Sequence, residues 1–124
     1  MSKILMPINP KYVDEIIFGN KKYEYRKIKP KRNDIDKMII YCTFPIMKVV
    51  AEVDIQDIFI DAPEKIWELT KDYSGTSKKF YDMYYKKSKN AVAYKLGDVK
   101  VYDKPMKLSD IGIDYVPQSF VYLD

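Results

Sequence analysis

The sequence contains no histidine and only one cysteine, Cys42, which lies within an apolar run. Without histidine, a Ser-His-Asp triad is excluded, and so are the usual zinc sites built from histidine and several cysteines. A single cysteine cannot form an internal disulfide, so we expect a reduced, cytoplasmic setting. We therefore predict no metal site and no cofactor.

The chain also lacks an apolar run of about 18 residues, which argues against a transmembrane helix and a membrane partner. Its first seven residues include one lysine but no hydrophobic signal region. No Gly/Ser-rich linker, low-complexity tract or repeat divides the 124 residues. We expect a single domain over residues 1–124, of ordinary globular size.

What the chain does have is positive charge, unevenly spread. The formal net charge is +4, yet residues 21–37 hold eight Lys or Arg side chains against three carboxylates. A second basic group, interleaved with tyrosines, falls between residues 78 and 89. Basic clusters with aromatic neighbours suit phosphate neutralisation and base stacking. The alternative interpretation is that the first cluster is a solvated loop and the second is the solvent-exposed face of a helix.

Hydrophobic periodicity predicts a mixed series of strands and helices. Asn9 and Pro10 favour the start of a helix over residues 10–18, and Gly19 favours its end. Asp61 resembles the N-cap of a second helix that closes at Gly75, and Thr76 or Ser77 caps a third. Strands are expected over residues 4–8, 22–28, 37–44, 49–60, 91–96, 99–102 and 117–123. A shift of apolar parity after Gln56 predicts a bulge in the fourth of them. Because strands and helices do not alternate strictly, we predict an α+β fold rather than a doubly wound sheet.

The segment from Gly19 to Arg26 reads Gly-x-Lys-x-x-Glu-x-Arg, directly after the first predicted helix. Glu24 and Arg26 lie two positions apart on a predicted strand and therefore share a face. Grouping Lys21, a carboxylate and a guanidinium so closely costs desolvation unless the three face water, a ligand or one another. The segment is therefore a candidate site as well as a structural joint.

This motif resembles the signature of ASCH domains, which are small relatives of the PUA domain. The strand and helix over residues 4–18, the strand end Thr43-Phe44-Pro45 and the closing Pro117-Gln118-Ser119-Phe120 are also similar to this family. The resemblance implies a small mixed or antiparallel PUA-like β-barrel with about three flanking helices around a cleft. It also implies that the cleft binds RNA or a nucleotide-like ligand. The candidate binding residues are then Lys21, Lys22, Glu24, Arg26, Thr43 and Ser119.

Two other functions stay open at this point. Some ASCH proteins are amidohydrolases that act on N4-acetylcytidine, and others are ribonucleases, which would make Lys21 and Glu24 catalytic residues. The amidohydrolases carry Thr where this chain has Glu24, and that departure weakens the amidase interpretation. A protein-interaction role is the third possibility. The sequence does not indicate an oligomeric state.

Overall fold

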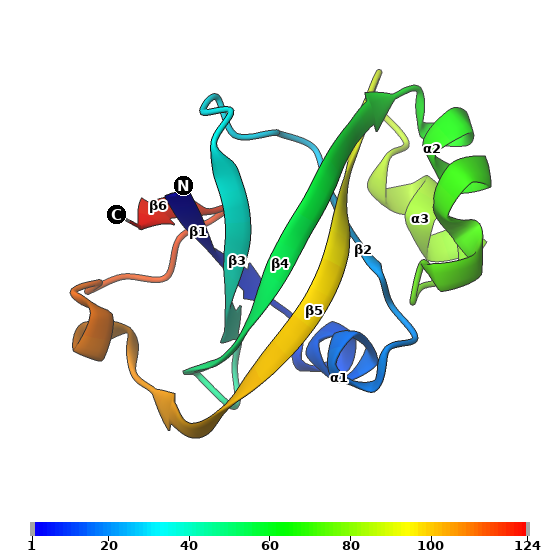
Figure 1. The fold of residues 1–124 in the computed structure, drawn as a ribbon. Helices are drawn as coiled ribbons and strands as arrows, with labels where there is room; N and C mark the ends of the chain where they lie inside the picture. Colours follow the sequence, from blue (N-terminus) through cyan, green and yellow to red (C-terminus); the bar gives the residue numbers. More distant parts are fainter. Residues whose placement is uncertain (1, 124) are drawn as a thin grey trace.

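The computed structural model describes residues 2–123 as one open, strongly twisted sheet with helices packed against it (Figure 1). The elements in chain order are β1 (Ser2–Ile8), α1 (Pro10–Phe18), β2 (Tyr23–Arg26), β3 (Ile35–Cys42), β4 (Lys48–Asp61), α2 (Pro63–Thr70), the 3₁₀ turn η1 (Lys71–Tyr73), α3 (Lys78–Tyr84), β5 (Ala91–Met106), the 3₁₀ turn η2 (Leu108–Ile111) and β6 (Val121–Leu123). No helix within residues 2–123 is long and apolar enough to cross a membrane.

The six strands lie in the order β2-β5-β4-β3-β1-β6. The pair β1–β3 is parallel and the other neighbours are antiparallel, so the sheet is mixed and the predicted α+β class is confirmed. The predicted barrel is wrong, because the sheet does not close. Its two edges are β2, with four residues, and β6, with three, and each pairs with one neighbour only. Strands this short at opposite edges give little backbone to complete a barrel.

Helix α1 forms as its flanking residues predict. The Asn9 side chain accepts a hydrogen bond from the Lys11 N–H, Pro10 occupies the first turn, and Gly19 ends the helix at φ +87°. The buried Val13 and Ile16 side chains pack into the main core cluster beside β1, β3 and β4. This packing fixes the direction in which the chain passes Lys21 and enters β2, the strand that carries Glu24 and Arg26.

Strands β4 and β5 form a long, irregular antiparallel pair. Their register shifts at three places, between Val49 and Asp57, which confirms a bulge in β4 near the position where apolar parity changes. The predicted break of β5 at Gly97 is wrong, since β5 runs unbroken through it. A Cβ atom at Gly97 would lie 2.9 Å from Gln56 Nε2, so the glycine admits a close neighbour instead of ending the strand.

The starts of two helices and of the last strand can be compared with the starts that the sequence predicts. Ser77 caps α3, as predicted, by accepting a hydrogen bond from the Phe80 N–H at 3.1 Å. The N-cap of α2 is Ala62 and not Asp61, because the Asp61 carboxylate accepts from the adjacent Ala62 N–H. The last strand begins at Val121, four residues later than predicted. Residues of α3 and β2 line the same pocket.

Candidate functional site

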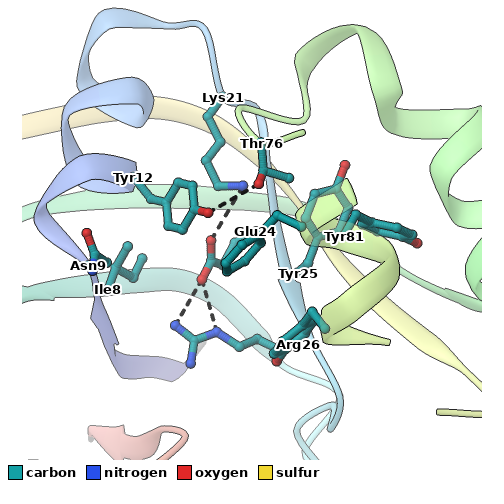
Figure 2. Close-up of a pocket in the computed structure, with 11 residues that line it drawn as sticks. Ile8, Asn9, Tyr12, Lys21, Glu24, Tyr25, Arg26, Thr76 and Tyr81 are labelled. Carbon is teal, nitrogen blue, oxygen red and sulfur yellow. Dashed lines mark hydrogen bonds and ion pairs between the residues drawn. The ribbon is translucent and has the colours of Figure 1, made fainter. Parts of the chain in front are cut away.

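A pocket of about 210 Å³ lies among the end of β1, helix α1, strand β2 and helix α3 (Figure 2). Its lining residues are Ile8, Asn9, Tyr12, Lys21, Glu24, Tyr25, Arg26, Thr76, Phe80, Tyr81 and Tyr84. Pockets for drug-sized ligands usually enclose about 300–1,000 Å³. This pocket is smaller, so its volume suits a ligand with a single ring system. The walls of the pocket are aromatic and its floor is charged.

The Lys21 side chain lies at the floor and is only 3% exposed. Its Nζ donates a hydrogen bond to the Ser74 carbonyl oxygen at 2.7 Å and lies 3.8 Å from Glu24 Oε1. The ammonium also faces the rings of Tyr12, at 5.1 Å, and Tyr25, at 4.8 Å. Burial lowers the pKa of the Lys21 amine below its usual range, although the Glu24 carboxylate opposes that effect.

The turn at residues 73–75, which is distant in sequence, covers the aliphatic part of the Lys21 side chain. Gly75 has φ +67°, and a Cβ atom there would lie 2.5 Å from Lys21 Cβ and within 3 Å of the next two side-chain carbons. The Lys22 N–H donates to the Tyr73 carbonyl on the same turn at 2.9 Å. The turn can therefore lie over Lys21 only with glycine at this position.

Glu24 and Arg26 form the second part of the charged floor. Glu24 Oε2 accepts a hydrogen bond from Arg26 Nε at 3.0 Å and forms an ion pair with Arg26 Nη2 at 2.9 Å. Arg26 Nη2 also donates to the Pro7 carbonyl at 2.6 Å, which ties β2 to the end of β1. Glu24 is 5% exposed. Because one buried carboxylate lies between two cations, the floor keeps a net positive charge that favours an anionic or electron-rich ligand.

Aromatic side chains from α1 and α3 form the walls. The hydroxyls of Tyr12 and Thr76 share a hydrogen bond at 3.1 Å, and the Tyr12 and Phe80 rings lie 6.1 Å apart. Tyr81 packs at 4.8 Å against Trp67, the one tryptophan of the sequence. The Phe80 side chain is 52% exposed, so it has free area for contact with a ligand.

The structure brings together three of the six predicted binding residues. Lys21, Glu24 and Arg26 line the pocket. The Lys22 side chain is exposed and lies 4.5 Å from the centre of the Tyr73 ring, facing a neighbouring recess. The other two, Thr43 and Ser119, are not among the lining residues. Thr43 donates its N–H to Ile8 in the turn after β3, and Ser119 is exposed before β6.

Sequence reasoning missed Tyr12 and Thr76 as site residues. Tyr12 precedes the buried Ile16 by four positions, so helical spacing places it on the inward face of α1. Local sequence signals indicate Thr76 only as a candidate helix cap. Its role depends on the fold, which sets the turn before α3 against α1.

The positions of the carboxylates and of Cys42 bear on metal and thiol chemistry. No group of three or more Cys, Asp or Glu side chains within residues 2–123 is arranged to hold a metal ion. Cys42 is buried, and burial raises the pKa of its thiol, which disfavours the nucleophilic thiolate.

An open mixed sheet with α1 and α3 enclosing a charged β2 strand defines a small α+β domain of the ASCH/PUA-like class. The ASCH domain model matches residues 6–101, and the chain belongs to this family. An ASCH protein from Zymomonas mobilis has the same fold, with a TM-score of 0.88 at 21% identity over 98% of this chain and 87% of that chain. The N-terminal domain of Staphylothermus marinus McrB is more distant, with a TM-score of 0.52 at 14% identity over 88% of this chain and 78% of that chain.

Curated relatives match the chain over a minor part of their own length. Large ribosomal subunit protein uL22 of Ureaplasma parvum is 34% identical over 91 residues, which cover 73% of this chain and 29% of that protein. ATP synthase subunit alpha of the same species is 28% identical over 121 residues, which cover 97% of this chain and 15% of that protein. The chain thus spans less than a third of the length of either relative.

Proposed function

We propose that this domain binds nucleic acid, RNA or a nucleotide-like ligand, by holding one base in the pocket between α1 and α3. The family and the fold support a nucleic-acid role at a coarse level. The base is the part of a nucleotide that an aromatic wall recognises, because every base has a face for stacking.

One observation carries the proposal: the charged residues of the motif and the exposed Phe80 ring line the same small pocket. Lys21 and Arg26 supply N–H donors and positive charge on the floor, and Glu24 holds both in place. Proteins that bind an unpaired base combine stacking on aromatic rings with hydrogen bonds to the base edge. The pocket offers both kinds of contact at a size suited to one base.

A titration of a short, fluorescently labelled RNA pool by anisotropy tests the proposal with a matched pair of variants. Phe80→Ala removes the exposed wall of the pocket. Met83→Ala removes a side chain that is 69% exposed on the same helix but does not line the pocket. Losing one base–aromatic stack costs about 1–3 kcal/mol of binding free energy, so Phe80→Ala should weaken binding and Met83→Ala should not. Equal affinities for the two variants would refute the proposal.

A hydrolase is the second candidate, with Lys21 and Glu24 as catalytic residues acting on a modified nucleoside such as N4-acetylcytidine or on RNA itself. It is favoured by one observation, the buried Lys21 amine with a lowered pKa beside a carboxylate. An amine whose pKa is moved toward neutrality is suited to general acid–base work. Incubation with N4-acetylcytidine and with RNA, followed by chromatography of the products, tests it. Turnover that disappears in Lys21→Met supports it, and no product from either substrate excludes it for both.

A further inference from the structure

Two basic segments that are far apart in the sequence meet at one end of the β2–β5 pair. Residues 27–31 follow β2, residues 86–89 lead into β5, and Arg26 pairs with Val92 where the strands meet. The Tyr85 hydroxyl bridges both sides by donating to the Arg26 carbonyl at 2.8 Å and lying 3.3 Å from that of Val92. Together these segments hold six exposed lysines, which we call the basic rim: Lys27, Lys29, Lys31, Lys86, Lys87 and Lys89.

The rim begins at the mouth of the pocket. Arg26 lines the pocket and Lys27 is the next residue. Lys27 Nζ lies 4.7 Å from the centre of the Tyr84 ring, and Tyr84 is itself a lining residue. A ligand that fills the pocket therefore has positive charge directly beside it, on the side where β2 ends.

The loop that carries half of the rim is held in place by tyrosine side chains. The Tyr94 hydroxyl donates to the Ile28 carbonyl at 3.3 Å, and the Tyr122 hydroxyl accepts from the Lys31 N–H at 3.0 Å. Pro30, between them, is buried. Because the backbone is already ordered, binding along this loop costs little further conformational entropy.

No aspartate or glutamate occurs within residues 27–31 or 86–89, so neither segment neutralises its own charge. Five residues in extended form span up to roughly 16 Å, which is longer than one phosphate group needs. A concentration of unneutralised lysines over such a span attracts a chain of phosphates and releases counterions when that chain binds.

We propose that the nucleotide in the pocket belongs to a single-stranded polynucleotide whose neighbouring phosphates lie across the basic rim. This inference rests on the proposed function, and it names the ligand as a polymer rather than a free nucleotide. The pocket holds one base, and the rim binds the backbone beside it.

Three triple variants test the rim with the same change of charge in each. Lys27, Lys29 and Lys31 are changed to Gln in one, and Lys86, Lys87 and Lys89 in the second. The control changes Lys100, Lys104 and Lys107, three exposed lysines in the second half of β5 and directly after it, away from its start at Ala91. Affinity for a labelled eight-nucleotide RNA pool and for a labelled dinucleotide pool is measured over a range of salt concentrations, and circular dichroism checks the fold of each variant.

Each rim variant should lower the slope of log affinity against log salt by about 2, since each phosphate contact on a single strand contributes about 0.7. Between about 50 and 200 mM salt, the wild type should then lose roughly twenty-fold more affinity than a rim variant. The preference for the longer RNA should shrink in the rim variants and persist in the control.

The outcomes separate the two proposals. If the rim variants keep the salt dependence and the preference for the longer RNA that the control shows, the proposal that the basic rim binds the phosphate backbone is wrong. Rim variants that behave as expected while Phe80→Ala binds normally overturn the pocket as the base site and leave the rim as a backbone-binding surface. A wild-type protein that binds neither RNA at low salt overturns both.

Discussion

At the scale of single residues, the charged floor of the pocket is held by contacts from outside the Lys-Glu-Arg motif. Lys21 lies just before the short strand β2, and Glu24 and Arg26 lie on it, so closeness in sequence alone groups the three. The Ser74 carbonyl and the Gly75 backbone reach Lys21 from a turn that no local pattern connects with it. Contacts of this kind depend on how α2 and α3 pack, which periodicity does not specify.

The contact between Gly75 and Lys21 gives a prediction with an internal control. Gly75→Ala and Gly112→Ala both place a Cβ atom at positive φ, which costs about 1–2 kcal/mol. Gly112 has no atom within 4 Å of that Cβ, whereas the new atom at Gly75 meets Lys21. Overpacking adds about 1–3 kcal/mol, so Gly75→Ala should lower the free energy of urea unfolding by more than Gly112→Ala does. Equal losses would mean that the turn shifts freely away from Lys21.

At the scale of elements, the sequence predicts those whose ends carry local signals. Asn9, Pro10 and Gly19 set α1, and Ser77 sets the start of α3, because capping depends on neighbouring residues alone. The continuity of β5 through Gly97 and the late start of the last strand were not predictable in this way. Both depend on pairing with a distant strand, β4 for β5 and β1 for β6.

The cap of α3 gives the prediction at this scale. Ser77→Ala removes the acceptor of the Phe80 N–H and should cost about 1 kcal/mol of stability. Because α3 supplies Phe80, Tyr81 and Tyr84 to the pocket, RNA affinity should also fall. The matched control is Ser109→Ala, which removes an exposed hydroxyl without a hydrogen bond in the described part of the chain. Urea unfolding of both variants measures the difference, and equal midpoints would show that the cap contributes nothing.

At the scale of the whole molecule, the sequence indicates the class of fold but not its closure. Alternating apolar residues predict a mixed set of strands, and a mixed sheet is what forms. Whether such a sheet closes depends on the lengths and partners of its edge strands, which come from the full pairing order. The same order brings residues 27–31 and 86–89 together, although charge counting along the chain treats them as separate clusters.

The buried tyrosines make the stability of the whole fold fall as the pH rises in the alkaline range. Burial raises the pKa of both Tyr25 and Tyr102 from 10.0 to about 12 and also raises the pKa of four others, Tyr81, Tyr84, Tyr85 and Tyr94. In the unfolded chain these hydroxyls ionise near 10, so above that pH the native state binds more protons than the unfolded state. The stabilising contribution is therefore complete below pH 10 and is lost as pH rises toward 12.

The titration of Lys21 has the opposite effect on the stability of the fold, and it acts over a lower pH range. Its folded pKa lies below the unfolded value of 10.5, so the native state releases this proton first and stability rises with pH up to about that value. Urea unfolding from pH 7 to 11 should thus show wild type gaining stability relative to Lys21→Met, followed by a fall above pH 10 that is shallower in Tyr25→Phe. A constant difference between wild type and Lys21→Met across this range would mean that Lys21 titrates like a solvated lysine. The pocket would then lack the buried amine on which its candidate chemistry depends.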